Sequence, residues 1–185
     1  MCTFIYNQQK DMRLFLTLIA FTLLLGACQS KGKLQPVPTD KAALLIAARE
    51  IIQNSGKCAF ITLDKKGHPQ ARTMDAFEPD ADFTVWMATN PKSRKVDQIK
   101  NDPRVTIYYS DKNENGYVSI YGMAEIINDQ QEKDRRWKDE WRDFYTNRTD
   151  GYLLIKITPV RLEVINYNKG IRGDSITWQP SVVNF

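Results

Sequence analysis

Residues 83–105 read FTVWMATNPKSRKVDQIKNDPRV, and this stretch carries the strongest fold signal in the chain. The apolar run 83–88 is rich in β-branched and aromatic residues and predicts a strand. Ser93 is a natural N-cap for a short helix over 93–101, which Pro103 stops. A second strand is expected over 105–110. The chain therefore passes from a strand through a cation-bearing turn into a short helix and back into a strand.

The segments on either side predict further strands that are joined mostly by hairpins. These strands are expected at 58–63, 70–77, 117–127, 152–158, 161–167 and, as a short piece, near 176–178. In the first hairpin turn, Gly67 stands where a positive φ is needed. Two longer helices are expected, one from Thr39 or Asp40 to Asn54 and one over 129–145. The first would bury an apolar stripe at helical spacing, made of Leu44, Leu45, Ala48, Ile51 and Ile52. In the second, a shared face would pack against the barrel or a partner subunit, with stacking on a ligand as the alternative; it consists of Trp137, Trp141 and Phe144.

Six or seven strands with two or three helices outside the strand series predict a mainly β protein, an antiparallel β-barrel with added helices. Alternating βα units and glycine-rich nucleotide fingerprints are absent from the sequence. The 185 residues, 42% of them hydrophobic, suffice for one core. With 26% charged and 11% aromatic residues, disorder, collagen and coiled coil are excluded. The net charge of +4 is too mild to predict a nucleic-acid partner.

Residues 1–27 are expected to be a secretory signal peptide and no part of the fold. The run Leu14–Ala27 is apolar but shorter than the ~18 to 20 residues that a membrane span needs. It ends in Leu25-Gly26-Ala27-Cys28, which resembles a bacterial lipobox, so Cys28 is expected to be the lipidated mature N-terminus. A buried N-terminal helix is the alternative interpretation of this segment.

Residues 28–38 are polar and contain two prolines, which predicts a tether, and residues 39–185 are expected to form the folded domain. This organisation predicts a lipoprotein of the bacterial cell envelope that meets the membrane only through its lipid anchor. Because Cys2 would be removed and Cys28 lipidated, Cys58 would have no disulfide partner.

The usual catalytic sets are hard to assemble from this sequence. The single histidine, His68, lies in a hairpin turn, and Cys58 lacks an evident base. Too few Cys and His residues remain for a zinc site, so no metal is expected. No carboxylate pair stands out, although the sequence leaves a glycosidase-type pair open. If the protein is an enzyme, its chemistry is expected to come from a cofactor.

Three cations have the clearest chemical meaning. Arg94 and Lys95 follow Ser93 in the first helical turn, where the helix dipole disfavours positive charge. Two cations beside free backbone N–H groups favour a bound anion. Arg72, in the strand after the first hairpin turn, could complete a phosphate site. A solvated charged turn with a water-facing strand arginine is the other interpretation, and spacing alone does not separate the two.

Three motifs then suggest a family. They are TN…SRK…DPRV within 89–105, GHPQARTM at 67–74, and GMA at 122–124. Together they resemble the pyridoxamine 5′-phosphate oxidase superfamily, in particular its general-stress-protein branch, over about residues 46–167. The resemblance implies an FMN-binding split β-barrel, usually a homodimer with FMN at the subunit interface.

The resemblance also implies which residues bind FMN. Arg72, Arg94 and Lys95 would hold the phosphate, and Ser93 at the helix start is a further expected cofactor-binding residue. The isoalloxazine ring would run beside Thr73, Met74 and Asp75, with further backbone and hydroxyl contacts from Ala88 and Thr89.

The implied function is that of an oxidoreductase that passes hydride or electrons from a reduced donor such as NAD(P)H to a small acceptor. Vitamin B6 oxidation is not expected, because Tyr117 stands where true oxidases carry Gln and residues 165–173 lack their His and paired Arg. A non-catalytic flavin- or haem-binding protein of the same fold, which stores or senses its ligand, is the alternative. A structural lipoprotein that has lost the cofactor is a third.

Overall fold

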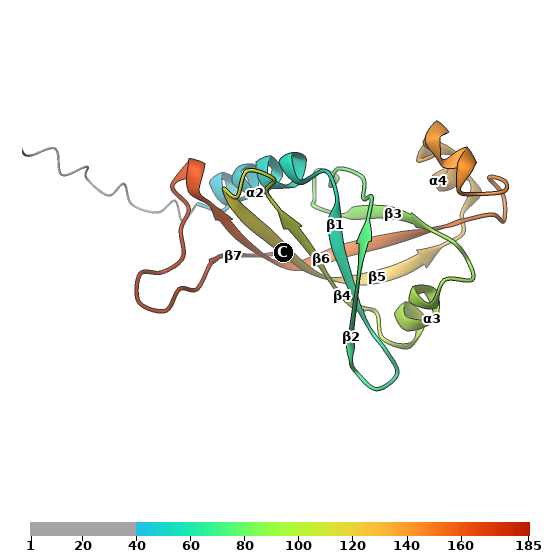
Figure 1. Cartoon of the computed structure of the whole chain (residues 1–185), viewed down its shortest axis with the longest axis horizontal. Coiled ribbons are helices and arrows are strands. Elements are labelled where there is room, and N and C mark those ends of the chain that lie inside the picture. The colour runs from blue at the N-terminus through green and yellow to red at the C-terminus, as the bar shows by residue number, and fades with distance from the viewer. Residues whose placement is uncertain (1–39) are drawn as a thin grey trace, which may run out of the picture. The chain divides into compact units, whose positions relative to one another are not determined.

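The computed structural model describes residues 40–185, so the predicted signal peptide, Cys28 and the tether lie outside the described residues. Figure 1 shows a curved antiparallel sheet, with helix α2 (Lys41–Ser55) lying over one part of it. Helices α3 (Arg94–Asn101) and α4 (Gln130–Arg135) lie toward the other end of the molecule. Within 40–185, no helix is both long enough and apolar enough to cross a membrane.

The described part of the chain forms one sheet of seven strands. They are β1 (Cys58–Leu63), β2 (Pro69–Met74), β3 (Val85–Thr89), β4 (Arg104–Ser110), β5 (Gly116–Ile127), β6 (Leu153–Asn166) and β7 (Ser181–Asn184). Their order is β2-β1-β4-β5-β6-β3, with β7 beside β6, and every pairing is antiparallel. Beyond β2, Ala76 bridges to Met87, and the Phe77 amide donates to the Trp86 carbonyl at 2.8 Å. This contact brings the two edges of the sheet together and confirms the predicted mainly β barrel.

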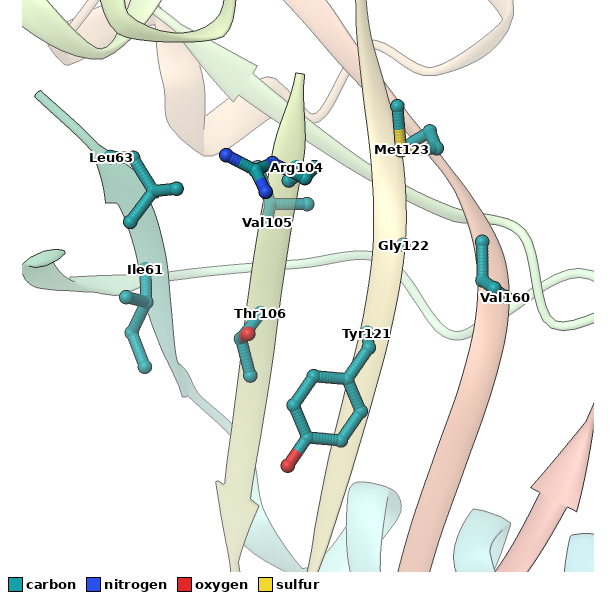
Figure 2. A pocket seen from close by; sticks show the side chains of 9 residues that line it. All are labelled: Ile61, Leu63, Arg104, Val105, Thr106, Tyr121, Gly122, Met123 and Val160. Atoms are coloured by element: carbon teal, nitrogen blue, oxygen red, sulfur yellow. The ribbon is translucent and has the colours of Figure 1, made fainter. Parts of the chain in front are cut away.

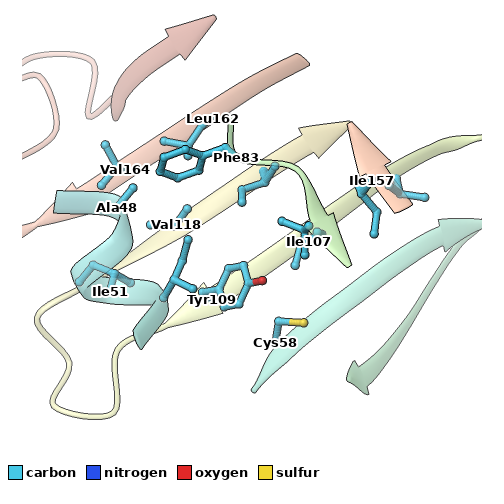
Figure 3. Close-up of a cluster of buried hydrophobic side chains, with 14 of the residues drawn as sticks. Ala48, Ile51, Cys58, Phe83, Ile107, Tyr109, Val118, Ile157, Leu162 and Val164 are labelled. Carbon is cyan, nitrogen blue, oxygen red and sulfur yellow. The ribbon is translucent and has the colours of Figure 1, made fainter. Parts of the chain in front are cut away.

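The barrel interior is filled by alternate residues of the strands. In β1, Cys58, Phe60 and Thr62 are buried while their neighbours are half-buried, the pattern of a strand with one face on a core. Figure 3 shows side chains from the strands converging with Ala48 and Ile51 of α2. The apolar stripe predicted for this first helix therefore covers the interior, as its spacing indicated.

Strand β3 is buried on both faces, because each face has its own cover. Val85 and Met87 belong to the barrel core, whereas Trp86 and Ala88 face a second apolar cluster. That cluster is aromatic, and its other members include Phe77, Trp137, Trp141, Tyr145 and Tyr152. The segment 129–152 thus covers the outer side of β3.

The single helix predicted over 129–145 is wrong. The structure has the short helix α4 and a separate 3-10 helix, η1 (Asp139–Asp143), with Lys138 in extended conformation between them. The break lets Trp137 and Trp141 both pack in the aromatic cluster, with ring centroids 6.0 Å apart. Phe144 does not share their face, since it is 75% exposed.

The two closing strands predicted at 152–158 and 161–167 are one strand, β6. Pro159 lies between the two predicted segments, opposite Gly122, and the pairing register shifts here because Val160 of β6 is the extra residue of a bulge. The N–H that proline lacks therefore falls at an irregular point of the ladder. The short strand predicted near 176–178 is also wrong. The last strand is β7, at 181–184, and residues 176–178 belong to a turn organised by Asp174.

Gly116, at the start of β5, provides a test of this sheet. Its φ is +148°, and a Cβ there would lie 2.0 Å from the Ile165 carbonyl oxygen, so Gly116→Ala must displace β6. We expect the free energy of unfolding to fall by about 3 kcal/mol or more. Gly67→Ala is the matched control, because φ is +81° but no atom lies within 4 Å; it should cost about 1 kcal/mol. Equal losses in urea denaturation would contradict this account of the β5–β6 pairing.

Candidate functional site

Arg72 is the residue that ties the site to the barrel. Its half-buried guanidinium donates from Nη1 to the Phe60 carbonyl at 3.1 Å and to Thr62 Oγ1 at 2.7 Å. Nη2 donates to Gln98 Oε1 at 3.0 Å. Gln98 lies on α3, so Arg72 links β2 to β1 and to the helix. All three acceptors are neutral.

Lys95 makes a second link, between α3 and the end of β3. Its ammonium donates to Ser93 Oγ at 2.7 Å and to Thr89 Oγ1 at 3.1 Å. Ser93 occupies the predicted N-cap position, but within residues 40–185 its hydroxyl caps no backbone N–H. The hydroxyl accepts a hydrogen bond from the Lys95 ammonium instead. The backbone N–H groups of Arg94 and Lys95 therefore have no hydrogen-bond acceptor within residues 40–185.

The structure gathers the three predicted cations, Arg72, Arg94 and Lys95, which we call the cation cluster. Burial lowers the pKa of Arg72, and the nearby Arg94 charge lowers it further. Burial also lowers the pKa of Lys95, with smaller contributions from Arg72 and Arg94. Among residues 40–185, no carboxylate forms an ion pair with any of the three. Three like charges without a counter-charge favour an anion as ligand.

The other predicted site residues lie along the strands that lead from this cluster. Thr73 and Asp75 are exposed next to Arg72, and Met74 is half-buried. The Asp75 carboxylate pairs with Lys138 Nζ at 3.0 Å. At the end of β3, Thr89 is buried beside Lys95, and the Ala88 side chain lies in the aromatic cluster, so a ligand near Ala88 would meet its backbone.

The sequence interpretation missed three residues. Gln98 follows Arg94 and Lys95 by one helical turn, so its place on their face was available from spacing. Thr62, whose hydroxyl donates to Gln98 Oε1 at 2.6 Å, carried no such signal. Lys138 is 63 positions from Asp75, and only the fold brings them together.

Cys58, a candidate nucleophile, and His68, a candidate base, are not placed for catalysis. Burial raises the pKa of the Cys58 thiol to about 12, so Cys58 stays protonated in the core. Among residues 40–185, the only acidic partner of the exposed His68 is Asp64 of its own turn, at 3.4 Å. Within the described range, no group of three or more His, Cys, Asp or Glu residues is arranged to hold a metal ion.

The outer face of the sheet carries a shallow cavity of about 410 Å³. Figure 2 shows side chains from four adjacent strands around it. Its lining is mostly apolar and consists of Ile61, Leu63, Arg104, Val105, Thr106, Tyr121, Gly122, Met123 and Val160. Ile61 and Leu63 alternate with Phe60 and Thr62, so this cavity and Arg72 lie on opposite faces of β1.

Comparison with known proteins identifies the family. Residues 46–170 match the family model described as "Pyridoxamine 5'-phosphate oxidase like". The chain belongs to this family. Proteins of the pyridoxamine 5′-phosphate oxidase-like family commonly bind flavin and small molecules, and are often dimeric.

Individual relatives are similar in sequence or fold. General stress protein 26 of Bacillus subtilis is 28% identical over 114 residues, which cover 60% of this chain and 80% of that protein. The crystal structure of general stress protein 26 from Bacillus anthracis has a TM-score of 0.61 at 23% identity, and the match covers 76% of this chain and 97% of that one. A related protein from Clostridium acetobutylicum has a TM-score of 0.62 at 22% identity, covering 69% and 92%. These structures confirm the split-barrel fold.

Gln98→Glu tests whether the cation cluster must stay without a carboxylate. The substitution is isosteric, and it places a negative charge where Gln98 Oε1 now meets Arg72 at 3.0 Å. A charge-assisted hydrogen bond is worth ~1.5 to 3 kcal/mol, so the affinity for added FMN, the phosphate ligand that the family resemblance implies, should fall roughly 10- to 100-fold in calorimetry. Gln98→Met, which removes the acceptor without adding charge, is the control and should cost less. An unchanged affinity in Gln98→Glu would mean that the anion binds elsewhere.

The pKa of Lys95 predicts how anion binding depends on pH. Because burial and two cations lower that pKa from the ordinary 10.5, the ammonium loses its proton at a lower pH than an exposed lysine. A bound phosphate favours the charged form, so binding should weaken as the pH rises through this lowered pKa and should take up a proton there. FMN titrations from neutral to alkaline pH should show the decline in the native chain. In Lys95→Arg the decline should disappear; a decline that persists would assign it to another group.

Proposed function

We propose that this protein binds FMN and acts as an oxidoreductase that passes hydride or electrons from a reduced donor such as NAD(P)H to a small acceptor. The observation that carries the proposal is the cation cluster, whose members have only neutral hydrogen-bond partners among residues 40–185. Membership of a family that commonly binds flavin supports FMN as the anion.

The residues fit the FMN phosphate group. Arg72 uses three N–H groups on protein acceptors, which leaves Nε–H and one Nη2–H for a phosphate oxygen. Arg94 has no side-chain hydrogen bond within 40–185, and Lys95 is already held at the helix start. Phosphate oxygens would replace solvent at these donors and neutralise the cluster.

The ring of the cofactor would extend along Thr73, Met74 and Asp75. Bound FMN would supply the electron-carrying chemistry, and the chain would hold it and control access to it. Lys138 lies 4.7 Å from the Phe77 ring centroid and neutralises Asp75, so the strand beside the proposed ring position carries a balanced charge. The segment 129–152 would thereby form one wall of the substrate site.

The protein is further proposed to be a homodimer that pairs through the outer face of its sheet, on the side of β1 opposite Arg72. Family members are often dimeric, and the outer sheet face offers an apolar surface around the 410 Å³ cavity. Met123 and Val160 on this face are 41% and 52% exposed. Pairing this face with a second copy would remove that apolar surface from water.

Attachment to the cell envelope completes the proposal. The lipobox-like sequence that ends in Cys28, after the apolar run Leu14–Ala27, supports export and lipidation. The folded domain would then be held at a membrane surface by the lipid on Cys28.

The visible absorption spectrum of the purified chain tests the cofactor and the activity together. We expect a flavin spectrum that bleaches when NADH or NADPH is added without oxygen. A flavin that no reduced nicotinamide bleaches would favour storage or sensing, and a haem spectrum would favour the haem-binding alternative. A colourless protein that binds no added FMN would contradict the proposal and favour a structural lipoprotein.

The double variant Arg94→Ala with Lys95→Ala should lose flavin retention while its circular dichroism and unfolding midpoint stay close to the native values. Two charge-assisted contacts at ~1.5 to 3 kcal/mol each predict at least a 100-fold loss of affinity. The matched control is Lys92→Ala with Lys100→Ala, which removes two exposed lysines of the same region and should retain flavin. Equal retention in both double variants would refute the site.

Val160→Asp tests the proposed dimer. A carboxylate in the apolar outer face should give a monomer in light scattering, because pairing this face with a second copy would bury an unpaired charge. Ile46→Asp is the control, since Ile46 is 64% exposed on α2, away from this face, and should leave the dimer intact. A Val160→Asp chain that stays dimeric would place the subunit interface elsewhere.

A further inference from the structure

Residues 172–180, which we call the apolar loop, connect the 3-10 helix η2 (Tyr167–Lys169) to β7. This loop carries the two most exposed large apolar side chains among residues 40–185: Ile176 is 86% exposed and Trp178 is 82% exposed. Two such side chains within three residues are an unusual feature for a water-facing loop.

The apolar loop is held in a defined conformation. The Asp174 carboxylate accepts from the Ile176 amide at 3.0 Å, from the Thr177 amide at 2.7 Å and from the Thr177 hydroxyl at 2.9 Å. The Trp178 amide donates to the Asp174 carbonyl at 2.9 Å, and the Asp174 amide donates to the Gln179 carbonyl at 2.8 Å. These five bonds close a turn that displays Ile176 and Trp178 outward.

The backbone of Trp178 has an unfavourable conformation. Its φ is +59°, a left-handed conformation that bulky residues rarely adopt. Gly173 allows the turn to close, since a Cβ there would lie 2.9 Å from the Trp178 carbonyl oxygen. A strained backbone that keeps a tryptophan in water suggests that the indole has a partner.

The apolar loop protrudes at the end of the molecule where α2 begins (Figure 1). The same region joins the two ends of the described domain: Lys41 Nζ donates to the Asn184 carbonyl at 2.8 Å and lies 5.2 Å from the Phe185 ring centroid. Residues 28–39, between the proposed lipid anchor and the domain, can span at most roughly 40 Å at ~3.1 Å per residue. The anchor would therefore keep this end of the domain within roughly 40 Å of the bilayer, which allows the apolar loop to reach it.

We propose that the apolar loop inserts Ile176 and Trp178 into the headgroup region of the membrane to which the protein is anchored. This inference rests on the lipid anchor of the proposed function. Tryptophan favours the membrane interface, where its ring is buried and its N–H stays hydrated. Arg172, exposed and without an ion pair within 40–185, can meet lipid phosphates.

Contact at two points, the lipid and the loop, sets the orientation of the domain. Helix α3, which carries Arg94 and Lys95, lies toward the other end of the molecule from the apolar loop (Figure 1). The cation cluster would then face away from the membrane, open to water-soluble ligands. A second copy of the chain is the less suitable occupant, because two side chains on a narrow loop bury far less than the ~800 Å² per partner of a stable interface.

Quenching by brominated lipids tests the proposal on the full chain reconstituted in phosphatidylethanolamine–phosphatidylglycerol vesicles. The emission of Trp178 is the difference between the native chain and Trp178→Phe, since Trp86, Trp137 and Trp141 pack in the aromatic cluster in both. We expect this difference to lose most of its intensity in brominated vesicles and to shift to shorter wavelength. Emission unchanged by bromine would overturn the proposal.

Matched variants make the outcome specific. Ile176→Ser should weaken the quenching of Trp178 severalfold, whereas Phe144→Ser, which removes a 75% exposed aromatic outside the loop, should leave it unchanged. In the absence of vesicles, iodide should quench the emission of Trp178. If Trp178 is instead protected from iodide, a second copy of the chain covers the loop and the proposal is overturned. Vesicle flotation and flavin absorbance are read from the same samples. Chains that float and carry flavin, but whose Trp178 is not quenched, would refute the loop contact alone.

Discussion

The half-buried guanidinium of Arg72 is the constraint on which the site depends. It bonds a carbonyl and a hydroxyl of β1 and an amide of α3, so it fixes where the helix starts relative to the sheet. Because Arg94 and Lys95 begin that helix, their positions follow from the same bonds. None of the acceptors carries charge, and the site therefore retains a positive charge that an anion can neutralise.

A second constraint is that β3 has no exposed face. Its inward residues belong to the barrel core, and Trp86 and Ala88 would meet water if residues 129–152 did not cover them. The aromatic packing of that segment interrupts its helix and directs Lys138 toward Asp75. A packing requirement of one strand thus shapes the wall of the proposed cofactor site.

Three surfaces with different chemistry lie on different parts of this small domain. The cation cluster suits a phosphate, the apolar outer face of the sheet suits a second subunit, and the apolar loop suits a lipid surface. Ile61 and Leu63 face the outer cavity while their neighbour Thr62 bonds Arg72, so alternation along β1 separates the first two surfaces. The turn organised by Asp174 separates the third from the sheet. One fold could therefore serve a ligand, a subunit and a membrane at once.

The sequence by itself determined whatever depends on neighbours within a few residues. The helix start at Ser93, the turn at Gly67 and the apolar stripe of the first helix are all local, and the structure has each of them. The motifs of the family are local as well, and the family match bears them out. Tertiary structure decided what depends on distant partners: the continuity of β6 through Pro159, the break at Lys138, and the contacts of Arg72 with Gln98 and of Asp75 with Lys138. The reason is physical. The spacing of nearby residues indicates which secondary structure a segment prefers. The strand pairing opposite Pro159 and the aromatic cover over β3 are formed by residues 30 or more positions apart. Their packing outweighs the local preference.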